Sequence, residues 1–180
     1  AVHLRPEPRY AFQLCDGVQT QVDRVLEAVR LAPRPFILYV TRPDEATEWL
    51  RRLREEGFRR VADFTGRTPP SQREILLNDW AANTLDGMVA TSAFGLGVDK
   101  TDVRTVIHAT MPESLDRFYQ EVGRAGRDGN AGASLLLFTQ QDSEQARGIA
   151  GATLIGDDSG YERWSLMVDH AVPDNTRPDV

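Results

Sequence analysis

The sequence predicts an α/β fold in which a parallel β-sheet carries helices on both faces. Short apolar runs alternate with helical patterns along the chain, and the links between them are short. Parallel neighbouring strands need a crossover connection, and a helix fits between each pair of runs. The length of 180 residues, with 41% hydrophobic and 27% charged residues, is enough for one globular domain with a core.

The expected strands are short runs of apolar and β-branched residues. They cover residues 10–14, 36–40, 60–63, 88–90, 105–109 and 134–138. The run FILYV at 36–40 is apolar throughout, which is typical of a strand buried on both faces. Asp86 and Gly87 form a turn signal before the strand 88–90.

Apolar stripes at helical spacing predict the helices between these strands. The two best marked stripes consist of Val18, Val22, Val25, Leu26 and Val29, and then of Ala46, Trp49, Leu50 and Leu53. Pro43 suits the first turn of the second of these helices, and Gly57 ends it.

Further helices follow the same pattern. Thr68 as cap and Pro69 as first residue open one of them. The expected buried faces are Ile75, Leu76 and Trp80 in that helix, and Leu115, Phe118, Tyr119 and Val122 in the next. A last helix is expected over 142–150, and residues 151–180 are expected to form a C-terminal extension with a weak helix around 164–168 and then a linker or tail.

Composition and charge exclude several classes of protein. No apolar run approaches the roughly 18 residues of a membrane-spanning helix, and AVHLRPEPRY does not resemble a signal peptide, so no membrane partner is expected. Cys15 is the only cysteine, which excludes an internal disulfide and a cysteine-based zinc site and indicates a cytoplasmic setting. His3, His108 and His170 lack metal-ligand spacing, and His108 is expected to be a packed core or loop histidine. The net charge of −6 means that any nucleic-acid contact must be local.

The segment ATSAFGLGVDK at 90–100 directly follows an expected buried strand. Hydroxyls and backbone amides at such a position can bind phosphate. Gly95 and Gly97 allow close approach of a backbone, and Asp99 can accept a hydrogen bond from a sugar hydroxyl or orient a neighbouring basic group. A dinucleotide fingerprint would need a third glycine and a following helix, and both are missing. The alternative is a simple glycine loop in which Thr91 caps a helix.

The segment QEVGRAGRDG at 120–129 places Arg124 and Arg127 three residues apart at the end of an apolar-striped helix. One helical turn would put both guanidinium groups on one side, and the neighbouring glycines leave room for a phosphate to reach them. The alternative is an ordinary helix C-terminus with favourable cations and a glycine stop.

Taken in order, with TVIHATMP between them, these two segments resemble motifs V and VI of superfamily 2 helicases. Their amino-acid sequences most resemble those of the RecQ family. FILYV followed by Thr41 and Arg42 resembles the motif IV strand and its loop. Thr65 and Gly66, with Gln72 and Arg73 in the next helix, resemble the family's glycine loop and its arginine. The resemblance covers about residues 5–142 and implies that residues 1–150 are a RecA-like helicase C-terminal lobe.

The resemblance also implies roles for single residues. Arg127 would be an arginine finger, and Arg124 would contact the γ-phosphate of ATP or position the finger. Gln120 would couple the nucleotide to the motif helix, and Asp99 would touch the ribose or brace the arginines. Gly97 and Gly123 belong to the same nucleotide-binding segments. The single-stranded DNA path would be lined by Thr41, Arg42, Thr65, Gly66, Thr91 and Ser92.

Other features of the RecQ family are missing from this sequence. There is no Gly-x-x-x-x-Gly-Lys-Ser/Thr loop, no Asp-Glu-x-His box and no set of zinc-binding cysteines, and Phe64 stands before Thr65 where the family usually has a histidine. We therefore expect the second lobe of a longer ATP-dependent DNA helicase, whose first RecA-like lobe binds most of ATP and Mg²⁺, so that this chain alone is inactive. The rival interpretation is a degenerate lobe that binds nucleic acid or protein without catalysis. Intact Arg124, Arg127 and Asp99 argue against such decay.

Overall fold

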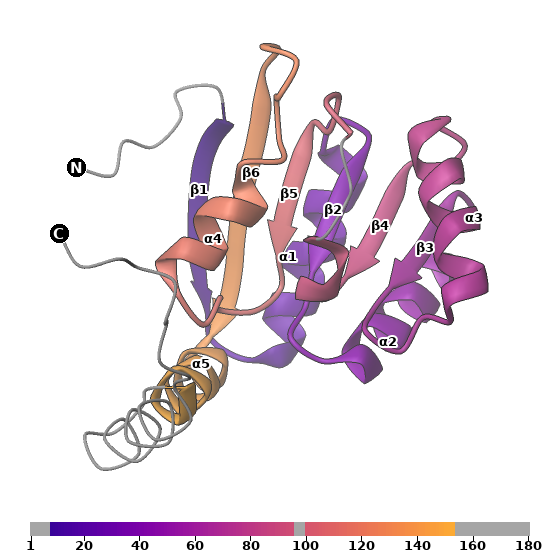
Figure 1. The fold of residues 1–180 in the computed structure, drawn as a ribbon. Helices are drawn as coiled ribbons and strands as arrows, with labels where there is room; N and C mark the ends of the chain where they lie inside the picture. Colours follow the sequence, from indigo (N-terminus) through magenta and orange to yellow (C-terminus); the bar gives the residue numbers. More distant parts are fainter. Residues whose placement is uncertain (1–7, 96–99, 154–180) are drawn as a thin grey trace, which may run out of the picture.

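The computed structural model describes residues 8–95 and 100–153, and it confirms the predicted α/β architecture. Six strands form one sheet in the order β1-β6-β5-β2-β4-β3, and every neighbouring pair is parallel (Figure 1). The strands are β1 Pro8–Cys15, β2 Phe36–Tyr39, β3 Val61–Phe64, β4 Gly87–Ala90, β5 Thr105–His108 and β6 Gly132–Thr139. The helices are α1 Val18–Leu31, α2 Pro43–Glu55, α3 Pro70–Ala81, the short 3₁₀ helix η1 Ser92–Gly95, α4 Leu115–Val122 and α5 Gln140–Thr153.

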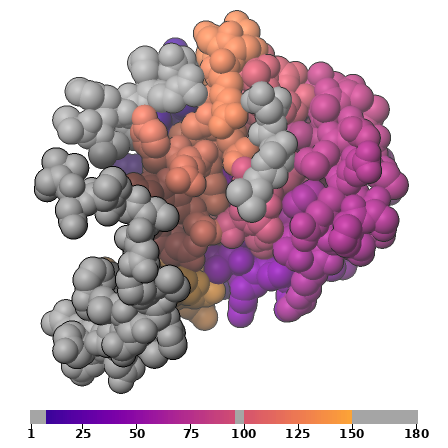
Figure 2. Space-filling view, viewed as in Figure 1, coloured from indigo at the N-terminus to yellow at the C-terminus, as the bar shows by residue number. Residues whose placement is uncertain are grey.

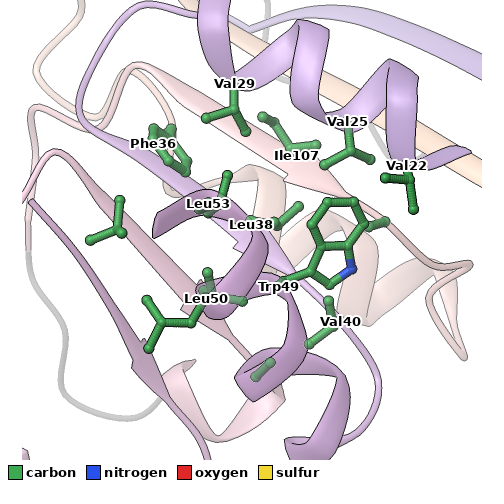
Figure 3. Close-up of a cluster of buried hydrophobic side chains, with 14 of the residues drawn as sticks. Val22, Val25, Val29, Phe36, Leu38, Val40, Trp49, Leu50, Leu53 and Ile107 are labelled. Atoms are coloured by element: carbon green, nitrogen blue, oxygen red, sulfur yellow. The ribbon is translucent and has the colours of Figure 1, made fainter. Parts of the chain in front are cut away.

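One face of the sheet is covered by α1 and α2, and a large apolar cluster fills the space between them (Figure 3). The buried side chains of α1 include Val22, Val25 and Val29, as the helical spacing predicts, while Val18 at the helix start is exposed. The predicted face of α2 is confirmed in full, because Ala46, Trp49, Leu50 and Leu53 are its buried residues. Burial of this many large apolar side chains supplies most of the favourable free energy of folding.

The other face packs against α3, η1 and α4, and here two predicted core residues are wrong. Ile75 of α3 is 60% exposed and Leu115 of α4 is 84% exposed. In α3 only Trp80 is buried, and this helix contacts the sheet at its outermost strand, β3 (Figure 1). In α4 burial increases along the helix until Val122 is enclosed, so the first turn lies beyond the core.

The start of α3 also differs from the prediction. Pro69 occupies the cap position with an extended backbone, and the helix begins at Pro70. A residue before proline is held out of the helical region, which explains the shift by one residue. The Thr68 hydroxyl is therefore no helix cap, and it accepts a hydrogen bond from the Thr65 amide at 2.9 Å instead.

The turn before β4 lies earlier than Asp86 and Gly87. Asn83 has a positive φ of 60° and forms the turn after α3, whereas Gly87 is already the first residue of β4. Gly87 pairs with Phe36, and a Cβ atom at position 87 would overlap the aromatic ring of Phe36. This position needs glycine because of close packing between two strands.

The C-terminal part of the described chain is α5, which runs across the expected boundary at residue 150. The weak helix expected around 164–168 lies outside the described residues, so the division at residue 150 stays a prediction. Among residues 8–95 and 100–153, no helix is both long enough and apolar enough to cross a membrane.

Candidate nucleotide and nucleic-acid site

A row of threonines lies at one edge of the sheet. Thr110, Thr41, Thr91 and Thr65 follow the strands β5, β2, β4 and β3, which are neighbours in that order. Parallel strands end at the same edge, and ligands of open α/β sheets bind there. The hydroxyl groups of Thr41 and Thr110 are 2.7 Å apart and share a hydrogen bond. Thr110 was missed in the sequence, although its position after a strand matches that of Thr41.

The structure brings Thr41 and Ser92 together in one small pocket of about 50 Å³. Its floor includes Tyr39 and His108, and its rim includes Arg117. The lining also includes Glu113, which pairs with Arg117 at 2.6 Å, and Glu121. Because hydroxyl groups and charged side chains meet here at the working edge of the sheet, the pocket can hold a polar group of a ligand.

Thr65 lines a separate, larger pocket at the end of β3, and Gly66 is the next residue of the same loop. The Arg73 guanidinium holds this loop, since Nη2 donates to the Gly66 carbonyl at 3.1 Å and Nε donates to the Thr68 carbonyl at 2.8 Å. The same guanidinium lies over the Phe64 ring. Arg73 therefore fixes the conformation of the loop through two hydrogen bonds, and its guanidinium packs on the Phe64 ring.

The Arg42 side chain does not line the small pocket that contains Thr41. Its guanidinium pairs with Glu45 at 2.8 Å, and Glu45 in turn accepts the backbone amides of Thr41 and Arg42. This is a capping box at the start of α2, and it explains why the chain turns sharply after β2. Arg42 lines a different pocket, on the face covered by α1 and α2.

The two arginines of the second segment do not lie on one helical turn, so that prediction is wrong. α4 ends at Val122, with Gly123 as its C-terminal cap, and both arginines belong to the loop that follows. Arg124 is only 8% exposed and donates from Nη2 to the Gly95 carbonyl at 2.8 Å. Arg127 is exposed, and its Nε donates to the Gly123 carbonyl at 3.0 Å. The glycines that surround the arginines end the helix early, which the spacing alone does not reveal.

We call residues 123–130 the arginine loop. Its backbone is bound to the segment before β5, because the Gly126 amide donates to Val103 at 2.9 Å and the Asp128 amide donates to Thr101 at 3.2 Å. Gly126 has a positive φ of 67°, which favours glycine at this bend. In Figure 1 α4 lies in front of the sheet, and Figure 2 shows the surface of the molecule from the same side.

A buried polar pair lies beneath the arginine loop. Nε2 of His108 is 2.9 Å from Oε2 of Glu121, and the His108 ring stacks on Tyr39 with centroids 5.3 Å apart. Burial raises the pKa of Tyr39 well above its usual range, against the opposing effect of the nearby Arg124 charge. The Tyr39 hydroxyl therefore keeps its proton. The expectation that His108 is a packed core histidine is confirmed, since its side chain is fully buried.

Lys100 closes the glycine segment on its C-terminal side. Its ammonium group is buried, lies 2.7 Å from Oδ1 of Asn83 and 2.9 Å from Oδ1 of Asp102, and stands over the Trp80 ring. These contacts attach the segment to the end of α3. Lys100 is recognisable in the sequence as the only lysine among 21 basic residues, but this fact alone predicts no role for it.

The remaining predicted site residues are Gln120, Gly123, Gly97 and Asp99. Gln120 is exposed near the end of α4, and Gly123 is the residue at which that helix stops. Gly97 and Asp99 lie outside the described residues. In the part of the chain that the structure describes, no three His, Cys, Asp or Glu side chains gather as a metal site would require.

Comparison with known proteins gives one family match. Residues 20–129 match the family model described as the helicase conserved C-terminal domain. The chain is 34% identical over 139 residues to the probable ATP-dependent DNA helicase RecS of Bacillus subtilis, covering 76% of this chain and 28% of that protein. It is 54% identical over 71 residues to the ATP-dependent DNA helicase RecQ of the same organism, covering 39% and 11%. The chain thus spans less than a third of the length of these relatives.

Solved structures support the same fold. The chain resembles the Escherichia coli DEAD-box protein SrmB with a TM-score of 0.70 at 20% identity, covering 83% of this chain and 87% of that one. It resembles the C-terminal domain of the DEAD-box protein Dbp5 with a TM-score of 0.66 at 17% identity, covering 91% and 98%. The fold described above is therefore that of the RecA-like lobe in these proteins.

Proposed function

This chain belongs to the helicase conserved C-terminal domain family, and from that premise we propose that it is the second motor lobe of an ATP-dependent, RecQ-like DNA helicase. Its proposed partners are single-stranded DNA and a first RecA-like lobe that binds most of ATP and Mg²⁺. Alone, the lobe is proposed to hydrolyse no ATP, since the phosphate loop and metal-binding carboxylates belong to the first lobe. The lone, buried Cys15 suits the reducing cytoplasm, where we place this activity.

The observation that carries the proposal is the link between the two segments of the resemblance. Arg124 of the arginine loop binds the carbonyl of Gly95 in η1, so the loop and the glycine segment form one unit. A Cβ atom at position 95 would lie 3.3 Å from the Arg124 guanidinium, which leaves little room for a larger residue. Arg127 lies on the same unit and is exposed. We propose that a phosphate presented by another lobe binds it.

Because Arg124 is buried and Arg127 is exposed, we assign the two arginines different roles. Charge develops on the phosphoryl oxygens during transfer, and a planar guanidinium stabilises it with two parallel hydrogen bonds. We assign that role to Arg127. Arg124 is enclosed and already bound to Gly95, so we assign it the positioning of the loop. Gln120, Gly123, Gly97 and Asp99 keep their proposed roles on the nucleotide side.

The proposed DNA path follows the threonine row. Thr41 and Ser92 share the small pocket, and Thr65 and Gly66 continue along the same edge. Thr91 lies between them, and Arg42 stays part of the proposed path at its outer side. Contacts with phosphates position a strand without reading its sequence. Closure of the cleft between two lobes would then move the strand in steps.

The decisive experiment replaces Arg127 by alanine in the full-length helicase that carries this lobe. Arginine fingers contribute about 10³ to 10⁵ in rate, so DNA-stimulated ATP hydrolysis should fall by about that factor while ATP affinity changes little. Lysine at position 127 should not restore the rate, because an ammonium lacks the planar fork. Phosphate release under single-turnover conditions measures the loss.

Arg51→Ala is the matched control, since Arg51 is an exposed arginine on α2 that pairs only with carboxylates of its own helix in the interactions seen here. It should keep the full rate. If Arg124→Ala loses hydrolysis while Arg127→Ala keeps it, the finger is assigned to the wrong arginine. If both variants turn over normally, the lobe is a non-catalytic binding module.

A further inference from the structure

We propose that the ion pair between Arg104 and Asp128 is a positioning unit that holds Arg127 in its productive place. This inference rests on the proposed function of Arg127. Asp128 directly follows Arg127, and both of its oxygens accept from the Arg104 guanidinium. The two distances are 2.8 Å from Nη1 to Oδ1 and 2.5 Å from Nη2 to Oδ2. A bidentate pair fixes orientation as well as distance.

Arg104 is a firm support because its backbone is built into the sheet. It directly precedes β5, its amide donates to the Pro35 carbonyl at 2.9 Å, and its carbonyl accepts from the Ala133 amide at 2.8 Å. Pro35 leads into β2 and Ala133 belongs to β6, which are the two neighbours of β5. The guanidinium therefore extends from the amino end of a central strand to Asp128 in the arginine loop.

Asp128 is fixed from the loop side as well. Its oxygens also accept from the backbone amide of Asn130 at 3.1 Å and from the Asn130 side chain at 2.9 Å. The two side chains of the ion pair are only 22% and 23% exposed. The hydrogen bonds from Arg104, followed by those from Asn130, hold the pKa of Asp128 far below its usual range. The carboxylate thus stays charged at neutral pH.

The arginine loop needs such a support because Arg127 has a glycine on each side of it within two residues. Gly126 and Gly129 both have positive φ angles, of 67° and 80°. Glycine has the widest backbone freedom, so a loop with glycine on both sides loses much entropy when it becomes ordered. A catalytic group that is ordered before the substrate arrives avoids that cost during the reaction. The ion pair provides this order one residue away from Arg127.

An ordinary surface ion pair would not carry such a role. Exposed pairs contribute little to stability, and ideal bidentate Arg–carboxylate geometry is a recognised exception. Arg51 and Glu48 on α2 form a useful contrast, since their pair is more exposed and both partners lie on one helix. The Arg104–Asp128 pair instead joins two segments that are 24 residues apart.

A double-mutant cycle in the full-length helicase tests the proposal. The variants are Asp128→Asn, Arg127→Ala and the two combined, with Glu48→Gln as the control. A small misplacement of a catalytic group costs up to about 10²-fold in rate, so Asp128→Asn should lower kcat for DNA-stimulated ATP hydrolysis by about 10- to 100-fold. The KM for ATP should stay within about threefold.

The combined variant gives the sharpest result. If Asp128 acts through Arg127, Asp128→Asn should cause no further loss in the Arg127→Ala background, since coupled residues are strongly non-additive. Arg104→Lys keeps the positive charge but lacks the two-pronged guanidinium. It should lower kcat less than Asp128→Asn does, and this loss should also disappear in the Arg127→Ala background. Because it leaves the carboxylate paired, it also serves if Asp128→Asn lowers the Tm too far to be assayed.

Two outcomes overturn the inference while the proposed function stands. One is an unchanged kcat in Asp128→Asn, and the other is an equal loss with and without Arg127. If Arg127→Ala itself keeps the full rate, the proposed function fails on the first arm of the same cycle.

Discussion

His108 is held from three sides beneath the site. Its ring stacks on Tyr39, meets Phe118 at a centroid distance of 5.3 Å, and binds the Glu121 carboxylate through Nε2. Glu121 stands in the last turn of α4, two residues before the arginine loop begins. The pair therefore fastens the end of that helix to β5. A buried carboxylate needs such a donor, because an isolated buried charge is very unfavourable.

We expect His108→Ala to lower the free energy of unfolding of this chain by about 3 kcal/mol or more, since removing one partner of a buried pair costs about 3 to 5 kcal/mol. The substitution also removes the ring that Tyr39 and Phe118 contact. Urea unfolding followed by circular dichroism measures the change. Glu48→Gln on the exposed face of α2 should stay within about 0.5 kcal/mol. A loss below about 1 kcal/mol for His108→Ala would contradict the role given to the pair.

At the scale of elements, periodicity predicts the side of a helix that is buried but not how much of its length meets the sheet. The stripe of α2 is buried from Ala46 to Leu53, because α2 packs along β3 and β4 and shares one apolar cluster with α1. The stripe of α4 has the same spacing, yet Leu115 is exposed and only Val122 is enclosed. Strand β4 shows a second limit, since the need for Gly87 arises from Phe36, which is distant in the sequence.

Gly87→Ala tests that contact between β2 and β4. The added methyl group would overlap the fully buried Phe36 ring, and overpacking of a core costs about 1 to 3 kcal/mol. Combining it with Phe36→Leu should recover part of this loss, because the smaller side chain leaves room. Thermal unfolding of the four proteins in the cycle gives the coupling energy. Gly148→Ala in α5, where a Cβ meets nothing within 4 Å, should be neutral or stabilising.

For the whole molecule, the sequence predicts the class of fold and the two segments of the site, but not their arrangement. The strand order depends on which crossovers form. It pairs β1, near the start of the described chain, with β6, near its end. The same order aligns the four threonines, including Thr110, which follows β5 at the distance at which Thr41 follows β2. The burial of Arg124 and the exposure of Arg127 likewise depend on contacts with η1 and with the segment before β5.

The negative net charge of the whole chain sets the expected mode of DNA binding. At −6, attraction must come from a few local phosphate contacts, so we expect weak binding of single-stranded DNA that does not depend on sequence. With about two to four contacts, the slope of log K against log salt should be about −1.5 to −3. Fluorescence anisotropy between about 50 and 200 mM salt measures it. Tight, salt-insensitive binding of one sequence would instead favour a non-catalytic module.

Lys100 is the only lysine of the chain, and its side chain is 4% exposed. Reagents and enzymes that acylate lysine need an uncharged amine at the surface, whereas this ammonium is held between Asn83, Asp102 and the Trp80 ring. Arginines, which make up all the other basic side chains, do not react with amine reagents. Acylation at Lys100 can proceed only when the segment that carries it separates from the end of α3. The only lysine side chain of the chain thus reports local opening next to the glycine segment, once acylation of the α-amino group is counted separately.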